Sequence, residues 1–162
     1  MNSAIRVTVN GRRHELDIDN RLSLVELVRE HLRLTGAHVG CRTGNCGACT
    51  LIVDGETVKS CCILAADVDG SEIITVEGIV TSPDALHPIQ AAFVEHQGLQ
   101  CGFCTPGILL STLVLLERNA SPTEDEIRHA IAGNLCRCTG YQNIVKSIQA
   151  AASARTILST RA

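Results

Sequence analysis

Eight of the nine cysteines in this chain fall into two groups of four, and their spacing restricts the fold more than any other feature. The first group has the pattern Cys-x4-Cys-x2-Cys with a fourth cysteine downstream, and the second has Cys-x2-Cys followed by a distant Cys-x-Cys. A chain of 162 residues must therefore gather thiols from distant segments at two places. The first group is Cys41, Cys46, Cys49 and Cys61, and the second is Cys101, Cys104, Cys136 and Cys138.

The spacing of the first group is the one known from plant-type [2Fe-2S] sites. Such a site needs a loop that wraps tightly around the cluster, so small residues are expected between the ligands. Gly40, Gly44, Gly47 and Ala48 supply them, and glycine also accepts positive φ. Zinc sites are usually built from paired Cys-x2-4-Cys knuckles, often with histidine. The first group therefore predicts a [2Fe-2S] cluster rather than zinc.

The spacing of the second group is less specific, because it is compatible with zinc, a [2Fe-2S] cluster or two disulfides. Thr105 and Pro106 follow Cys104 as an expected N-cap and first-turn proline, and the apolar run after them predicts a helix. Cys104 is thus expected at a helix N-terminus, where the macrodipole and free N-H groups stabilise a thiolate or an anionic cluster. This argument favours metal over disulfides but does not separate iron from zinc.

Composition excludes several classes of function. The net charge is -3 and only three residues are aromatic, so neither nucleic acid nor an anionic membrane is expected as a partner. No run of 18 apolar residues occurs and the N-terminus lacks an apolar segment, so we expect neither a signal peptide nor a membrane span. Nine cysteines without an export signal indicate a reducing, cytoplasmic compartment, where clustered thiols are more often metal ligands than disulfides.

The first half of the chain reads as α+β. Alternating apolar residues around Asn10-Gly11 predict an opening hairpin, and Ser23 with Glu26 forms a capping box for a short helix ending near Gly36. Further strands are expected over 50–53, 56–60 and 72–76. The result is a compact roll around one helix.

The second half reads as four helices. They are expected from His87-Pro88 to about Gln97, after Pro106, from Ser121-Pro122 with Glu124 as a capping box, and from about Tyr141. The predicted division is residues 1–78, a linker over 79–85 and a helical domain over 86–162. Each half is near the size at which an apolar core alone is marginal, so metal binding should contribute to folding.

Three motifs carry a family resemblance: GCRTGNCGACT at 40–50, QCGFCTPG at 100–107 and GNLCRCTGY at 133–141. Together they resemble the iron-sulfur subunit of molybdenum hydroxylases, the xanthine dehydrogenase and aerobic CO dehydrogenase family. The similarity extends over nearly the whole chain, and it implies that the second group also binds a [2Fe-2S] cluster.

The resemblance implies a plant-ferredoxin-like β-grasp domain followed by a four-helix [2Fe-2S]-binding domain. It implies an oxidoreductase subunit that relays electrons from a large molybdopterin subunit to a medium FAD subunit, in a complex expected to be a dimer of heterotrimers. Substrate would be hydroxylated on the molybdenum subunit with oxygen from water, so this chain carries no catalytic residue of its own. The first group would hold the cluster near the flavin and the second the cluster near molybdenum, with Gln100 and Cys138 against the pterin.

Three residues outside the two groups lie near the first group in sequence: Cys62, His38 and Arg42. Cys62 directly follows Cys61; matching to the family favours Cys61 as the ligand, and in an extended strand only one of the two would face the cluster. Cys62 is then expected to be a small buried apolar side chain. His38 and Arg42 lie near the first group, and a cation there should raise the cluster potential. The alternative function is a stand-alone ferredoxin or redox sensor, and the substrate is not specified by this chain.

Overall fold

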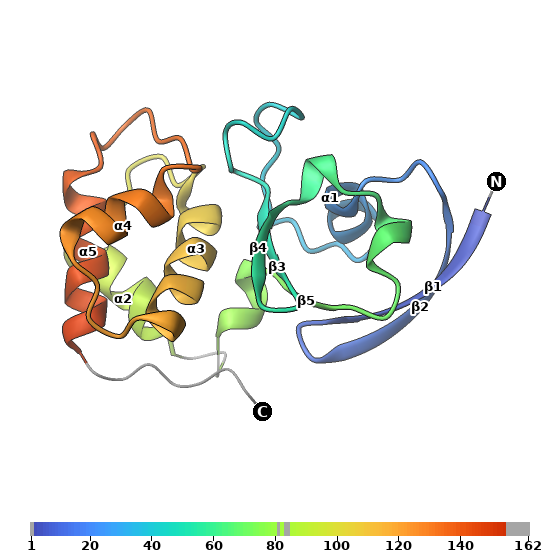
Figure 1. Ribbon diagram of the computed structural model, residues 1–162, viewed down its shortest axis with the longest axis horizontal. Helices are drawn as coiled ribbons and strands as arrows, with labels where there is room; N and C mark the ends of the chain where they lie inside the picture. The colour runs from blue at the N-terminus through green and yellow to red at the C-terminus, as the bar shows by residue number, and fades with distance from the viewer. Residues whose placement is uncertain (1, 81, 83–84, 155–162) are drawn as a thin grey trace.

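The structure is a computed structural model that describes residues 2–80, 82 and 85–154. Figure 1 shows a sheet with its short helices on one side of the molecule and helices α2 to α5 on the other. The α+β class with a ferredoxin-like part and a helical part is confirmed. None of the helices in the described ranges has the length and apolar character needed to span a bilayer.

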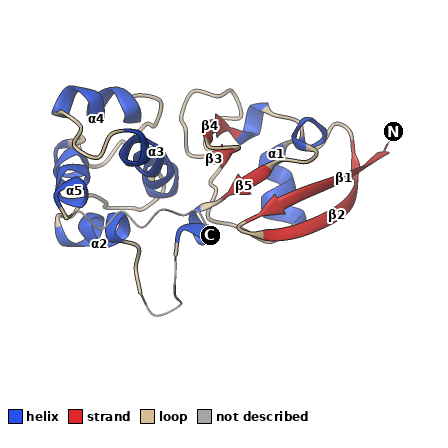
Figure 2. Cartoon of the chain, turned by 60° about the horizontal axis from the view of Figure 1, so that its bottom comes forward, coloured by secondary structure: helices blue, strands red, loops and turns tan. Residues whose placement is uncertain are grey.

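The five-stranded sheet has the order β2-β1-β5-β3-β4, in which β1 and β5 are parallel and the other neighbours antiparallel (Figure 2). Ile5, Val7 and Val9 are buried and alternate with more exposed residues, as expected for a strand with one covered face. The strands are β1 (Asn2–Val9), β2 (Arg12–Asp19), β3 (Thr50–Val53), β4 (Glu56–Lys59) and β5 (Glu72–Ile74).

The opening hairpin is confirmed, with Asn10 and Gly11 both at positive φ in its two-residue turn. The predicted strand at 72–76 is two residues shorter, because η4 (Val76–Ile79) begins there.

The predicted capping box also forms. Ser23 accepts a hydrogen bond from the Glu26 N-H, and the Glu26 carboxylate accepts from the Ser23 N-H, at the start of α1 (Leu24–Glu26). The chain continues as the π-helix η1 (Leu27–His31), so the prediction that this helix ends near Gly36 is wrong. Arg33, at φ 60, is in the left-handed region and stops the helix earlier.

The four helices of the second half are α2 (Pro88–Glu95), α3 (Thr105–Arg118), α4 (Glu124–Ile131) and α5 (Gln142–Ser153). Two predicted caps are wrong. Cys104 itself is the N-cap of α3, so Thr105 is already helical. The α4 capping box uses Thr123 and Glu126 instead of Ser121 and Glu124, because the Thr123 hydroxyl accepts from the Glu126 N-H.

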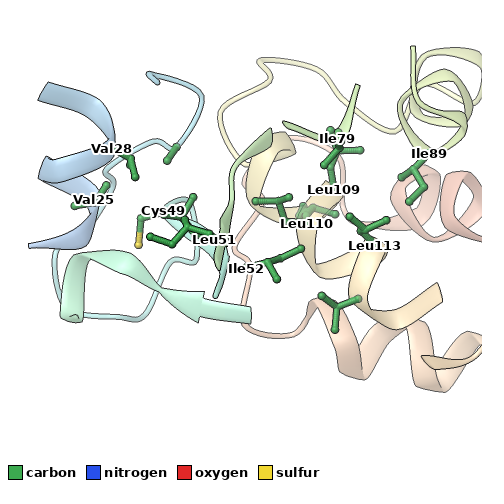
Figure 3. Close-up of a cluster of buried hydrophobic side chains, with 14 of the residues drawn as sticks. Val25, Val28, Cys49, Leu51, Ile52, Ile79, Ile89, Leu109, Leu110 and Leu113 are labelled. Carbon is green, nitrogen blue, oxygen red and sulfur yellow. The ribbon is translucent and has the colours of Figure 1, made fainter. Parts of the chain in front are cut away.

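Strand β3 joins the two halves through one continuous core. Thr50, Leu51 and Ile52 are all buried, which indicates that both faces of this strand are covered. Figure 3 shows the labelled side chains in an unbroken band from α1 and η1 through β3 to α3 and α2. Since neither half keeps a separate core, the marginal size of each is offset by packing against the other. The labelled residues of the band are Val25, Val28, Cys49, Leu51, Ile52, Ile79, Leu109, Leu110, Leu113 and Ile89.

Three further short helical turns complete the first half: η2 (Ser60–Cys62), η3 (Ala65–Val68) and η4. The predicted linker over 79–85 begins at Ile79, which is buried, and contains residues 81, 83 and 84, which lie outside the described residues. The end of the predicted helical domain, from 155, lies outside them as well.

Candidate functional site

The loop before β3 wraps around the Cys41 sulfur. Main-chain N-H groups of Thr43 and Cys46 each lie 3.4 Å from Cys41 Sγ. Hydrogen bonds from the Thr43 side chain and from these N-H groups lower the pKa of the Cys41 thiol to about 6. Thiolate is the form that binds metal, so this loop prepares Cys41 to act as a ligand.

Tight wrapping depends on the glycines that the sequence indicated. Gly44 and Gly47 have φ of 76° and 71°, in the region where glycine is unstrained. A Cβ on Gly40 would lie 3.0 Å from Cys46 Sγ, and one on Gly47 would overlap the Gly133 carbonyl oxygen. The loop therefore approaches both a sulfur of its own group and the second half of the chain.

The other two thiols of the first group lie together. Cys49 is buried directly before β3. Burial is the main cause that raises the pKa of its thiol to about 11, and the neighbouring Cys61 side chain raises it further. Ser60 Oγ donates to the Cys49 carbonyl at 2.6 Å and so fixes η2 beside it. Metal binding at this pair must therefore release a proton from Cys49 at neutral pH.

Cys62 differs from its prediction in two respects. It lies in the turn η2, not in an extended strand, so it does not point opposite to Cys61; the two sulfurs are 3.6 Å apart. It is also exposed, so the expectation of a buried apolar side chain is wrong. The turn therefore keeps the two sulfurs close together, and the Cys61 side chain also interacts with Cys49.

The second group forms from the loops before α3 and α5. Cys101 and Cys138 are exposed, with their sulfurs 3.5 Å apart, and Cys104 lies against Cys136. Burial raises the pKa of the Cys104 thiol to about 12, so desolvation outweighs the helix N-terminus that was expected to favour its thiolate. Gln100, the other residue predicted at the pterin contact, is exposed beside Cys101.

Tyr141 supports the segment that carries Cys136. Its hydroxyl accepts a hydrogen bond from the Cys136 N-H at 2.8 Å and donates to the Asn134 carbonyl at 3.1 Å. Tyr141 itself is at φ 67, the turn that leads into α5. This bracing holds the second thiol group at a fixed place relative to the helices.

The two thiol groups are joined by a direct contact that the sequence did not reveal. The Leu135 N-H donates to the Cys46 carbonyl at 2.8 Å, and Leu135 directly precedes Cys136. Asn134, 1% exposed, donates from Nδ2 to the Gly47 carbonyl at 2.9 Å and to Thr50 Oγ1 at 3.1 Å. Cys46 of the first group is thus hydrogen-bonded to Leu135, the residue directly before Cys136 of the second group. A polar Asn inside a cysteine motif was the only signal for it.

His38 forms a second link between the groups. Its Nδ1 lies 2.8 Å from the Phe103 carbonyl, and since a carbonyl only accepts, Nδ1 carries the proton. The two rings stack with centroids 4.8 Å apart. His38 therefore faces the loop between Cys101 and Cys104 as well as preceding Cys41.

Arg42, the cation predicted to influence the first cluster, is paired. Its guanidinium lies 2.8 Å from a Glu26 carboxylate oxygen, and this hydrogen bond, with those from Ser23, lowers the pKa of Glu26 to about 2. The charges of the two partners largely cancel at a distance, which weakens the basis of the Arg42 prediction.

The arrangement of thiols fits two-iron clusters. In the first group Cys49 lies against Cys61, and in the second group Cys104 lies against Cys136 and Cys101 against Cys138. A [2Fe-2S] cluster binds four cysteines through two irons, and each group supplies four.

Comparisons with known proteins agree with this chemistry. Residues 7–77 match the family described as 2Fe-2S iron-sulfur cluster binding domain, and residues 75–149 match the [2Fe-2S] binding domain. These two domains support two [2Fe-2S] clusters in the chain.

Two curated relatives are similar over most of their length. The nicotine 6-hydroxylase small subunit of Paenarthrobacter nicotinovorans is 52% identical over 89% of this chain and 86% of its own. The caffeine dehydrogenase subunit gamma of Pseudomonas sp. (strain CBB1) is 48% identical over 90% of this chain and 88% of its own.

A solved structure is similar throughout as well. A chain of quinoline 2-oxidoreductase from Pseudomonas putida 86 superimposes with a TM-score of 0.91 and 41% identity, covering 94% of this chain and 95% of that one. The spacing of the cysteines, the fold and these relatives agree, and the chain belongs to the family of small iron-sulfur subunits of the molybdenum hydroxylases.

Proposed function

We propose that this chain relays electrons from a molybdopterin subunit to an FAD subunit of a molybdenum hydroxylase. Cys41, Cys46, Cys49 and Cys61 would hold the cluster on the flavin side, and Cys101, Cys104, Cys136 and Cys138 the one on the molybdenum side. A bound [2Fe-2S] cluster takes up and gives back one electron at a time. The substrate would be hydroxylated on the molybdenum subunit, with oxygen from water.

The observation that carries the proposal is the bridge between the two thiol groups. Cys46 and Cys136 are connected through the main chain and one hydrogen bond, from the Leu135 N-H to the Cys46 carbonyl. A stand-alone ferredoxin needs only one cluster at an exposed rim. Two thiol groups held together by a direct main-chain hydrogen bond suit a relay between two partners better.

The exposed residues at the second group support a partner on that side. Phe103 and Leu135 are large apolar side chains, 47% and 59% exposed, next to the exposed thiols Cys101 and Cys138. Large apolar side chains gathered on a surface are typical of contact sites. We propose that the molybdopterin subunit covers this surface and that Gln100 and Cys138 contact the pterin there. The Gln100 amide can both donate and accept hydrogen bonds to the pterin.

Several parts of the proposal concern the whole complex. We propose one large and one medium partner per chain, a dimer of such heterotrimers, a cytoplasmic location, and the domain division 1–78, 79–85 and 86–162. The choice of substrate would belong to the molybdenum subunit. Because relatives carry the names of nicotine and caffeine enzymes, N-heterocycles are the first compounds to test.

Affinity purification of the natural complex tests the relay. The proposal predicts that two larger chains co-purify, one with molybdopterin and one with FAD, and that substrate reduces both clusters. A chain that purifies alone and still reduces small acceptors would support the stand-alone ferredoxin instead.

Serine variants of the adjacent cysteines test the ligand set. In Cys61→Ser, one of two electron paramagnetic resonance (EPR) signals should be lost or altered, and in Cys62→Ser both should remain. The opposite pattern would make Cys62 the ligand.

A further inference from the structure

Lys59 places a cation between the first thiol group and the second half of the chain. It is the last residue of β4, two residues before Cys61, and its side chain is half-buried. Nζ donates to Thr50 Oγ1 at 3.0 Å and lies 3.3 Å from the position of a Cβ on Gly133. The hydrogen bond holds the ammonium group beside Thr50, which follows Cys49, and the distance to Gly133 places it next to the second half of the chain.

The surroundings of Lys59 include three cysteines of the first group. Burial lowers the pKa of its ammonium group, whereas charges on Cys49, Cys46 and Cys61 act in the opposite direction. Three of the four proposed ligands of the first cluster are therefore close enough to interact electrostatically with this one cation.

No carboxylate neutralises this charge in the part of the chain that the structure describes. The four ion pairs among those residues are Arg21 with Asp19, Arg42 with Glu26, Arg118 with Glu56 and Arg128 with Glu124. Arg42 is closer in sequence to the ligands, but Glu26 offsets its charge. Lys59 thus differs from Arg42 in being both unpaired and partly shielded from water.

We propose that Lys59 sets the reduction potential of the first cluster. Reduction adds one negative charge, and a fixed, half-buried cation stabilises the reduced state more than the oxidised one, which raises the potential. Partial burial strengthens this effect, because water and salt screen the interaction less than at an exposed site. The inference rests on the proposed assignment of Cys41, Cys46, Cys49 and Cys61 to that cluster.

The test is a redox titration of the purified complex at one pH, with both clusters followed by EPR. Lys59→Gln removes the charge but keeps a side-chain donor for Thr50. We expect it to shift the midpoint of one signal to a more negative potential and to leave the other signal nearly unchanged. The shifted signal should be the one that Cys41→Ser alters.

Two controls separate charge from structure. Lys59→Arg keeps the cation and should have a midpoint close to that of the wild type. The double variant Glu26→Gln with Arg42→Gln removes a neutralised pair and should shift the midpoint much less than Lys59→Gln. Lys59→Met provides a second neutral variant, in case Lys59→Gln does not assemble.

The outcomes distinguish this inference from the proposed function. If both signals are present and neither neutral variant shifts a midpoint, Lys59 does not set the potential, although the ligand assignment stands. An equal shift in Lys59→Arg would also overturn the inference, because the geometry and not the charge would then be responsible. If Cys41→Ser leaves both EPR signals unaltered, the result would instead contradict the assignment of Cys41 as a ligand.

Discussion

Asn134 offers the sharpest test of how the two halves are joined. It is 1% exposed, and its side chain makes three hydrogen bonds: from Nδ2 to the Gly47 carbonyl and Thr50 Oγ1, and from Ser111 Oγ to Oδ1. Asn134→Ala removes all three, although the Gly47 carbonyl keeps its hydrogen bonds from Thr50 and Thr50 Oγ1 keeps the one from Lys59. We expect the variant to unfold more easily while its fold remains the same.

The expected loss follows from these contacts. A net contribution of roughly 1 kcal/mol for each of the three hydrogen bonds gives about 3 kcal/mol. For a chain of this size 1 kcal/mol corresponds to about 2–4 °C in melting temperature, so the midpoint should fall by about 6–12 °C. Because the contact precedes Cys136, we also expect the clusters to be lost earlier on heating.

The assay is thermal unfolding of the cluster-loaded chain, followed by far-UV circular dichroism and by visible absorption. Asn45→Ala is the matched control, because Asn45 is an exposed asparagine in the first thiol loop that bonds only to Thr43 Oγ1 among the described residues. Its midpoint should change little, since exposed substitutions usually cost within about 0.5 kcal/mol. If Asn134→Ala melts at the same temperature as the control, the hydrogen bonds of Asn134 do not stabilise the fold.

Three further predictions concern the loops around the thiols. Gly47→Ala should destabilise the chain by more than the roughly 1–2 kcal/mol of a left-handed backbone alone, because the new methyl group overlaps the facing main chain; an unchanged melting midpoint would contradict this. Tyr141→Phe should lower the free energy of unfolding by about 1 kcal/mol, because the Cys136 N-H loses its hydrogen-bond partner. The visible absorption of its clusters should also bleach faster under a chelator, and a rate equal to that of the wild type would show that Tyr141 does not support the second group. In the loaded chain a thiol reagent should label mainly Cys62, which is exposed, and mass spectrometry finding Cys61 labelled instead would reverse their assignment.

Local patterns in the sequence were sufficient for the local parts of the fold. The Asn10-Gly11 turn and the Ser23 to Glu26 capping box each depend on a few adjacent residues, and both form as predicted. The cysteine spacing likewise predicted a tight loop with glycines at positive φ. Such features can be read from sequence because their partners are neighbours along the chain.

Errors arose where two local signals competed. Ser121 and Thr123 both fit the start of α4, and the pair that forms is Thr123 with Glu126. The prediction for Cys62 assumes an extended strand, but the chain turns at Ser60 and leaves Cys62 exposed. In both cases the local path of the backbone, which the residue types do not specify, determines which side chain caps the helix or faces the solvent.

Local sequence patterns do not predict the contacts between the two halves of the chain. Asn134 and Gly47 are 87 residues apart, and His38 and Phe103 are 65 apart. No sequence spacing predicts that either pair is in contact, so the hydrogen bonds between the two halves can be identified only from the structure. Lys59 belongs to the same class, because its position beside Gly133 follows from that packing.

The presence of two clusters is tested most directly by the iron and sulfide content of the chain purified without oxygen. Two [2Fe-2S] clusters require two irons each, so we expect about four irons and four sulfides per chain. Reduction should then give two EPR signals of equal intensity, one altered in Cys41→Ser and the other in Cys104→Ser. Zinc in place of iron, or a single signal altered by both variants, would show that the chain does not hold two separate [2Fe-2S] clusters.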